Sequence, residues 1–525
     1  MADVREGGAG ERNVSESRSR ATRLLQGVVL AGGFASAACS TSGVSVSNPT
    51  APVPAGTAPA MRDTSPPPIV REMRGVWIAT VANIDWPSRT SLSADQQRAE
   101  LVDLLDRAAA GGFNAVVFHV RPAGDAVYRS TLEPWAAMLT GRQGTDPGYD
   151  PLSYAIEQAH QRGLELHAWI NPFRAGSARD TTNLAATHSF TVRRDVLRVY
   201  GPQLWFDPGE PAVQDHVMRV VNDIVQRYDI DAIHADDYFY PYQAKDSAGA
   251  VIDFPDSTSY ARSGSTLSRA DWRRDNVDRF VERMNREVHQ RKPVVKVGIS
   301  PFGIWRPGNP SGVVGLDAYA TIYADSRKWL QQGWVDYLAP QLYWAITSPQ
   351  QSYPALFDWW REQNVKNRHL WPGLASYRVS DGTPNAYGTG EIADQVALTR
   401  ARAPGTGHIL YNATTTLKRA NGAVVATVAP LQARRALVPA SPWLDGVAPV
   451  APTIAISGRS LLITPSAGEA ARWWYVRVRS ADGWMERTIF GDTRTIMLDA
   501  DPLRVMVNAI DQAGNASAAA DWRRP

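Results

Sequence analysis

Eight short apolar runs recur along the middle of the chain and are separated by polar loops and amphipathic helical patterns. Alternation of this kind is typical of βαβ units, in which each helix returns the chain to the start of the next parallel strand. The runs are almost continuously apolar, as expected of strands that are buried on both faces. Eight such units predict a closed (β/α)8 TIM barrel of the α/β class. The runs cover residues 75–81, 115–120, 165–170, 232–238, 294–300, 337–343, 370–375 and 408–411.

The helices of this barrel are predicted from their start and stop signals. Residues 93–110 begin with a capping Ser93, repeat leucines at helical spacing and end before two glycines. Similar patterns predict helices over 153–162, 211–228, 269–290 and 326–332. A glycine-rich phosphate loop does not follow the first run, which disfavours a dinucleotide-binding sheet. We expect the barrel to occupy residues 71–441.

Residues 448–525 have a different pattern. Their apolar residues alternate in short stretches separated by Gly, Asp and Pro turns. Such stretches predict a small all-β sandwich of fibronectin or immunoglobulin type. We favour a spacer role for it over a second sugar-binding surface.

The first 39 residues have the order of an export signal. Three arginines precede an apolar run over 24–35, which is too short to span a bilayer, and small residues then lead to Cys39. This order is similar to the bacterial lipoprotein box, although Ser36 stands where an aliphatic residue is usual. We predict a signal peptide over 1–39 that is lipidated at Cys39, a disordered tether over 40–70, and a protein held at a membrane of the cell envelope. Soluble export after cleavage and an accidental apolar segment are the alternatives.

Composition excludes several classes of function. Cys39 is the only cysteine, so a disulfide framework or a cysteine-based zinc site cannot form within the chain. The formal net charge is only +3 and long basic runs are absent outside the N-terminus, so a nucleic-acid partner is not expected. The 18 tryptophans exceed what packing usually needs and fit the binding of sugar rings.

Polar and aromatic residues gather where the apolar runs stop, which in a barrel is the end that carries the active site. Carboxylates, amides, arginines and aromatic rings without a cofactor loop are typical of a sugar site. The members of this set are Asn83, Asp85, Trp86, His119, Arg121, Asp125, His167, Trp169, Asn171, Arg174, His234, Asp236, Asp237, Tyr238, Tyr240, Ser300, Trp305, Arg306, Gln341, Tyr343, Trp344, Ser376, Tyr377, Arg378, Tyr411 and Asn412.

Asp236 and Asp237 are the sharpest signal in this set. Adjacent carboxylates repel each other, which raises the pKa of one and leaves a proton-bearing acid beside an ionised base. Glycoside hydrolysis requires that division of labour. The alternative is a turn cap beside a salt-bridge partner, which the position at the end of the fourth run disfavours.

Two mechanisms are compatible with this pair. A conventional scheme needs a second carboxylate across the barrel, for which Asp125, Asp85 and Glu133 are candidates. In the other scheme the N-acetyl group of the substrate attacks the anomeric carbon, one aspartate orients the amide and its neighbour protonates the leaving oxygen. The adjacent pair favours this second, substrate-assisted scheme.

Three histidines at matching strand positions allow a metal-dependent alternative. His119, His167 and His234 lie on the second, third and fourth runs, as in metal-dependent barrel hydrolases and deacetylases. Because they can also point into the barrel core as neutral, hydrogen-bonded side chains, we expect neither a metal nor another cofactor.

Several motifs, in order along residues 71–440, resemble the bacterial glycosyl-hydrolase-like family that includes the divisome-localised glycosidase acting on denuded peptidoglycan strands. They are REMRGVW (71–77), FHVRPAGDAVY (118–128), EPW (133–135), LTG (139–141), HAWINP (167–172), DDYFYP (236–241), ISPFGIWRP (299–307) and APQLYW (339–344). The resemblance implies an envelope lipoprotein that hydrolyses strands of alternating N-acetylglucosamine and N-acetylmuramic acid after amidases have removed the stem peptides. On these motifs the implied site residues are Arg121, Asp125, Asn171, Asp236, Asp237, Gln341, Tyr343 and Trp344.

We therefore predict a glycoside hydrolase that cleaves β-1,4 bonds in peptide-free peptidoglycan strands. A glycosidase for another exported polysaccharide, a non-catalytic wall-binding module and a metal-dependent deacetylase are the alternatives. The predicted catalytic residues are Asp236, Asp237 and Asp125, and the predicted substrate-binding residues are Arg121, Asn171, His234, Tyr238, Tyr240, Trp305, Gln341, Tyr343 and Trp344.

Overall fold

The computed structural model describes residues 65–177 and 184–525. The predicted signal peptide, Cys39 and most of the predicted tether lie outside the described residues. Pro66–Pro525 form one compact unit. Within the described part of the chain, we find no helix with the length and apolarity needed to cross a membrane.

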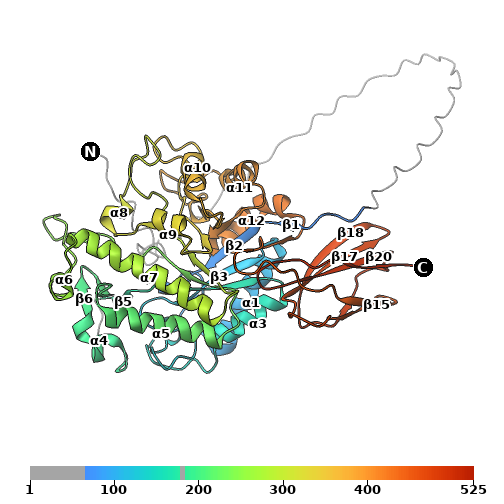
Figure 1. Ribbon diagram of the computed structural model, residues 1–525, viewed down its shortest axis with the longest axis horizontal. Coiled ribbons are helices and arrows are strands. Elements are labelled where there is room, and N and C mark those ends of the chain that lie inside the picture. The colour runs from blue at the N-terminus through green and yellow to red at the C-terminus, as the bar shows by residue number, and fades with distance from the viewer. Residues whose placement is uncertain (1–64, 178–183) are drawn as a thin grey trace, which may run out of the picture. The chain divides into compact units, whose positions relative to one another are not determined.

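A closed parallel sheet forms the centre of this unit (Figure 1). Going round it, the order is β11, β10, β9, β8, β4, β3, β2, β13 and β12, and β11 and β12 are two parts of the seventh strand. They are separated by Trp371 and Pro372, because a proline has no N–H to donate to the ladder. The predicted (β/α)8 barrel is confirmed. Its strands are β2 Met73–Ile78, β3 Ala115–Arg121, β4 Glu165–Ile170, β8 Ala232–Ala235, β9 Lys296–Ile299, β10 Tyr337–Leu338, β11 His369–Leu370, β12 Gly373–Ala375 and β13 Gly407–Tyr411.

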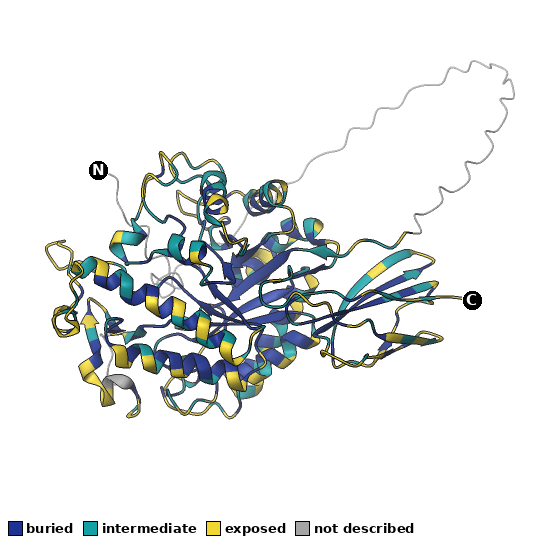
Figure 2. Cartoon of the chain, viewed as in Figure 1, coloured by how far each residue is buried: buried dark blue, intermediate teal, exposed yellow. Residues whose placement is uncertain are grey.

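Helices surround the sheet and bury one face each against it, as Figure 2 shows. The first helix, α1, starts with the predicted cap. The Ser93 side chain accepts a hydrogen bond from Gln96 N, and the Gln96 side chain accepts one from Ser93 N. The long helices are α1 Ala94–Ala110, α3 Pro151–Gln161, α5 Pro211–Arg227, α7 Arg269–Arg291, α10 Tyr353–Gln363 and α11 Glu391–Arg402. The shorter ones are α2 Ala137–Thr140, α4 Ser189–Val192, α6 Ser257–Ser263, α8 Ala318–Thr321, α9 Ser326–Gln332 and α12 Ala423–Val428.

A small antiparallel sheet interrupts the barrel after its third strand and was not predicted. It consists of β5 Arg174–Ser177, β7 Gln203–Phe206 and β6 Leu197–Tyr200, in that order. The fourth and sixth barrel strands also end earlier than the apolar runs suggested, at Ala235 and Leu338. The residues that follow them therefore leave the sheet and form the loops at its carboxyl end.

The C-terminal residues form two antiparallel sheets that share the core of a small sandwich, as predicted. One sheet contains β15 Thr453–Ser457, β16 Ser460–Thr464 and β19 Thr495–Met497. The other contains β18 Gly483–Phe490, β17 Trp473–Ser480, β20 Arg504–Ile510 and β21 Ala520–Arg523. A parallel bridge between β1 Val70–Arg71 and β14 Ala436–Leu437 joins the two ends of the barrel segment.

Arg472, just before β17, ties the sandwich to the start of barrel strand β8. Its Nη2 donates to Asp231 Oδ1 over 2.6 Å and its Nη1 to Asp229 Oδ2 over 2.6 Å. Burial alone would raise the pKa of Asp231, but Arg472 and His160 hold it far below its usual range. The contact is almost inaccessible to water, since Arg472 is 8% and Asp231 1% exposed. The sandwich is therefore fixed to the barrel through a buried ion pair.

We expect Arg472→Met to lower the free energy of unfolding by about 3 kcal/mol, because it leaves the Asp231 carboxylate buried with too few partners. Urea unfolding measures the effect, with the exposed Arg459→Met as the control. Adding Asp231→Asn to Arg472→Met should restore part of the loss. Equal stability of Arg472→Met and the wild type would contradict this account of the interface.

Candidate active site

The two aspartates lie directly after β8 at the carboxyl end of the barrel. Asp236 Oδ1 accepts one hydrogen bond from Asp237 N over 2.9 Å and another from Gln341 Nε2 over 3.1 Å. Asp237 Oδ2 accepts from the Tyr242 hydroxyl. Gln341, which follows β10, is held in turn by its bond to Ser300 O. The fourth, fifth and sixth strands thus bring their end residues onto one pair of carboxyl groups.

Both carboxyl groups are buried, and this determines their protonation. Burial, and next the charge of Asp237, raise the pKa of Asp236 well above its usual range. Burial also raises the pKa of Asp237, but the hydrogen bonds from Tyr242 and Asp236 offset part of that rise. The pKa of Asp236 is thus raised further than that of Asp237, which favours Asp236 as the proton-bearing member of the pair.

Partly exposed aromatic rings surround the pair. The ring centroids of Tyr343 and Tyr411 lie 6.2 Å apart, and those of Tyr343 and Tyr377 lie 5.9 Å apart. Trp344 packs edge-on against Phe302, with ring centroids 5.7 Å apart. Rings of this kind present flat apolar faces that suit the C–H faces of pyranoses.

Four of the predicted binding residues, Tyr238, Gln341, Tyr343 and Trp344, lie on the loops at this end of the barrel and are only partly buried. Burial, and next the negative charges of Asp237 and Asp236, raise the pKa of the Tyr238 hydroxyl well above its usual range. The structure therefore brings this subset together with Asp236 and Asp237.

Arg121 and Asn171 are occupied by contacts within the protein. Arg121 is completely buried, and its guanidinium donates to both carboxylate oxygens of Glu133 and to Asn171 O, the last over 2.5 Å. Burial would raise the pKa of Glu133, but Arg121 and His216 hold it at about 2. Asn171 Nδ2 donates to Pro122 O. These residues brace the loops that follow β3 and β4.

Asp125 and Asp85, candidates for a second acid, are also engaged locally. Asp125 accepts from Ala123 N and Gln143 Nε2, and burial raises its pKa to about 6. Asp85 accepts from Ala79 N over 2.8 Å and Thr414 N over 2.7 Å, and burial raises its pKa to about 6 as well. Asp85 thereby joins the loop after β2 to the one after β13.

The remaining predicted residues lie below or beside the pair. His234 lies on β8 two residues before Asp236, is completely buried, and contacts Ser300 and Tyr337. Tyr240 is 1% exposed and packs against Phe254 and Tyr323. Trp305 donates to Asp325 and stacks on Trp359, with centroids 5.9 Å apart.

The three histidines considered as metal ligands make other contacts. His167 and His234 both meet the Tyr337 hydroxyl, and His119 stacks on Trp169 with centroids 3.7 Å apart. In the described ranges, the one group of three ligand atoms close enough to share an ion belongs to Asp445, Glu469 and Asp511, away from these histidines.

Sequence reasoning missed Tyr242 and Tyr337. Tyr242 follows the DDYFYP motif by one residue, so extending that motif would have included it. Tyr337 was counted as an ordinary strand residue, and nothing in its local sequence shows that its hydroxyl crosses the barrel to two histidines.

Comparison with known proteins places this geometry in context. The model of the family described as Glycosyl hydrolase-like 10 matches residues 72–387. Glycosyl hydrolase YngK of Bacillus subtilis (strain 168) is 39% identical over 442 residues, which cover 81% of this chain and 86% of YngK. Glycosyl hydrolase DigH of Escherichia coli (strain K12) is 35% identical over 389 residues, which cover 68% of this chain and 86% of DigH. Among solved structures, the PgaB (BpsB) glycoside hydrolase domain from Bordetella bronchiseptica is 12% identical with a TM-score of 0.45, covering 69% of this chain and 99% of that domain.

Proposed function

Since the chain belongs to the Glycosyl hydrolase-like 10 family and is a glycoside hydrolase, we propose that it cleaves β-1,4 bonds in peptidoglycan strands that have lost their stem peptides. The observation that carries the proposal is the buried pair Asp236 and Asp237, whose pKa values are both raised by burial and which lies close to partly exposed aromatic rings. A polysaccharide substrate follows from the class of enzyme. The peptide-free strand is the specific proposal.

The pair supports a substrate-assisted reaction. The acetamido oxygen of the sugar attacks its own anomeric carbon while the bond to the leaving oxygen breaks, and Asp236 gives its proton to that oxygen. The hydrogen bond from Tyr242 favours the ionised form of Asp237, which accepts a hydrogen bond from the acetamido N–H and stabilises the positive oxazolinium ion. Water then adds to the anomeric carbon and returns a proton to Asp236, so the enzyme is regenerated.

The surroundings of the other acids favour this scheme over a conventional one. Asp85 accepts hydrogen bonds from two backbone amides, and Asp125 accepts hydrogen bonds from Ala123 N and Gln143 Nε2 in the loop after β3. An acid that serves as nucleophile or base should instead face the substrate from the opposite side of the bond. The adjacent pair supplies both required groups from a single loop.

Reducing ends released from a panel of polymers test the substrate. Denuded strands should be cleaved, whereas intact peptide-bearing sacculi, chemically N-deacetylated strands and plant or capsular glycans should be cleaved far more slowly. Equal cleavage of N-deacetylated strands would exclude participation of the acetamido group. Preferential cleavage of another polysaccharide would replace the proposed substrate while leaving the enzyme class unchanged.

Trp344→Ala should raise KM for denuded strands about tenfold and change kcat little, because a stacking ring contributes binding that is equal in the ground and transition states. Steady-state kinetics on strands of defined length measure both constants. Trp359→Phe, at a buried ring on α10, serves as a control for general loss of packing. A fall in kcat without a change in KM would exclude the stacking role of Trp344.

The N-terminal lipid anchor is a separate proposal. Lipidation at Cys39 would hold the enzyme at a membrane of the cell envelope, with the segment over 40–70 giving it reach. Metabolic labelling with a fatty acid should mark the wild type and not Cys39→Ala, and the variant should leave the membrane fraction. A labelled Cys39→Ala protein would contradict the proposal.

A further inference from the structure

The four-stranded sheet of the C-terminal sandwich carries arginines that lie side by side across its strands. Residues directly opposite one another in neighbouring strands point to the same face of a sheet. Arg479 of β17 lies opposite Trp484 of β18 on one side and opposite Arg504 of β20 on the other, and Arg504 lies opposite Arg523 of β21. These four residues therefore form one line across the sheet, with neighbouring strands about 5 Å apart. We call this line the arginine row.

The arginine row lies on the face of the sheet that is turned away from the core of the sandwich. Val478 of β17 belongs to that core, and the next side chain along a strand points to the opposite face. Arg479 therefore points outward, and so do the residues opposite it. Arg523 is exposed, and Trp484, Arg479 and Arg504 are half-buried. A ligand from the solvent can therefore reach the row.

The positive charges of the row have few negative partners. Like charges directly opposite one another in a sheet repel and destabilise it. The carboxylate of Asp521 accepts hydrogen bonds from Arg504 Nε over 2.8 Å, from Arg504 Nη2 over 2.6 Å and from Arg523 Nη2 over 3.4 Å. Among the residues that the structure describes, Arg479 takes part in no ion pair. Three guanidinium groups thus share one carboxylate, so a further anion would be attracted to them.

Trp484 adds an aromatic ring to this charged surface. The guanidinium carbon of Arg504 lies 5.9 Å from the centroid of the Trp484 ring. The surface thus offers a flat apolar ring, guanidinium donors for acid groups and the Asp521 carboxylate as an acceptor for hydroxyls, a combination that suits an acidic sugar polymer. An anionic membrane fits less well, because Asp521 and Glu486 lie on the same face and repel its headgroups, and lipid-binding clusters usually contain roughly four to eight cations.

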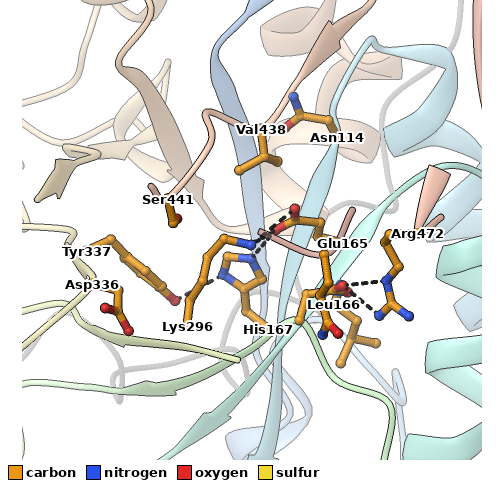
Figure 3. Close-up of polar contacts among 12 residues, drawn as sticks. Asn114, Glu165, Leu166, His167, Lys296, Asp336, Tyr337, Val438, Ser441 and Arg472 are labelled. Atoms are coloured by element: carbon orange, nitrogen blue, oxygen red, sulfur yellow. Dashed lines mark hydrogen bonds and ion pairs between the residues drawn. The ribbon is translucent and has the colours of Figure 1, made fainter. Parts of the chain in front are cut away.

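The sandwich packs at the amino ends of the barrel strands, opposite the end that carries the two aspartates. Arg472, which precedes β17, pairs with Asp231, which precedes β8. Figure 3 shows Arg472 beside Leu166 at the start of β4, and Leu166 N donates to the same Asp231 carboxylate over 2.8 Å. Asp236, by contrast, follows the last residue of β8. A ligand on the arginine row is therefore bound apart from the candidate active site.

We infer that the arginine row and Asp521 form a second, non-catalytic binding site for a glycan that carries free carboxylates. In a peptide-free strand each muramic acid has a free lactyl carboxylate, which is an uncharged amide while the stem peptide is attached. The identification of the ligand as this strand rests on the proposed function, whereas the preference for an acidic glycan rests on the row. Attachment at a second site keeps the enzyme close to its polymer between cleavages. The sandwich thus gains a binding role in place of the spacer role that its sequence favoured.

Binding to the full chain carrying Asp236→Asn and Asp237→Asn tests the inference, because this parent form should leave its polymers intact. Adding Arg479→Gln and Arg523→Gln should weaken the binding of denuded strands and of polygalacturonate, a polymer of uronic acids, by about tenfold at low salt. The difference should shrink as the salt concentration rises. Neutral dextran should show no dependence on the row. Fluorescence anisotropy of labelled polymers measures the affinities.

Two controls accompany the glutamine variant. Arg459→Gln removes an exposed arginine at the turn between β15 and β16 of the same sandwich, and it should bind both acidic polymers as the parent does. Arg479→Lys with Arg523→Lys keeps both positive charges and should restore most of the affinity. Thermal unfolding checks that each variant is folded, and relief of the repulsion within the row should leave the glutamine variant at least as stable as the parent.

Equal affinity of the glutamine variant and the parent for both acidic polymers would overturn the inference. A loss of affinity confined to vesicles of phosphatidylglycerol would also overturn it and make the row a membrane contact, and an equal loss for dextran would remove the role of the carboxylates. If the wild type does not cleave denuded strands but binding of polygalacturonate depends on the row, the acidic-glycan site stands and the proposed substrate falls. Cleavage of denuded strands together with binding that is independent of the row would do the reverse.

Discussion

Asp237→Asn is expected to hydrolyse denuded strands at least about 100-fold more slowly than the wild type while binding them with nearly unchanged affinity. The amide keeps the size of the carboxylate and a hydrogen-bonding oxygen for Tyr242, but it lacks the negative charge that stabilises the oxazolinium ion. The loss should therefore appear in kcat. Initial rates of reducing-end release and equilibrium binding to strands measure the two quantities separately.

Asp106→Asn is the matched control, because Asp106 is an exposed carboxylate of α1 that pairs with Arg162 on the outside of the barrel. It should retain full activity. Wild-type turnover by Asp237→Asn would remove Asp237 from the chemistry, and a loss confined to binding would make it a substrate contact.

Asp236→Asn is expected to lower activity on denuded strands by about 100-fold to 10,000-fold, since it removes the proton given to the leaving oxygen. A synthetic N-acetylglucosaminide with an acidic aryl leaving group needs little protonation, so the variant should keep most of its activity on it. Asp237→Asn should be impaired on both substrates. The opposite pattern would exchange the roles of the two aspartates.

The variant Asp236→Asn should also be more stable than the wild type at neutral pH. A carboxyl group whose pKa is higher in the folded than in the unfolded state contributes its full stabilisation below the unfolded pKa and loses it as pH rises through the folded pKa. Asp236 is such a group, because burial and Asp237 raise its pKa. Thermal unfolding should therefore show a gain in Asp236→Asn that is larger at pH 8 than at pH 4. A destabilised variant at pH 8 would contradict the raised pKa.

The repeating apolar runs predicted the barrel because a strand that is buried on both faces is almost continuously apolar, and such runs are visible in the sequence. The pair Asp236 and Asp237 was identifiable for a similar reason, since its place at the end of a run fixes it at the carboxyl end of the sheet. The sandwich followed from its alternating residues, and Arg472 within it could not be paired with Asp231, because the two are 241 positions apart.

The roles of residues near strand ends were harder to predict, because one position along a strand changes the face on which a side chain lies. Arg121 belongs to the motif FHVRPAGDAVY, yet its guanidinium is enclosed by Glu133 and by backbone carbonyls. Tyr240 points into packing, while Tyr242, two residues on, meets Asp237. Distinctions of this kind depend on where loops turn, which hydrophobic periodicity does not encode.

Mass spectrometry of the products released from purified denuded strands tests the central claim most directly, with the wild type and an Asp236→Asn, Asp237→Asn double variant compared side by side. We predict short wild-type products whose new reducing end is a single type of N-acetylated sugar, formed by addition of one water, and intact strands with the double variant. Intact strands with the folded wild type, or the same products from the double variant, would contradict the account.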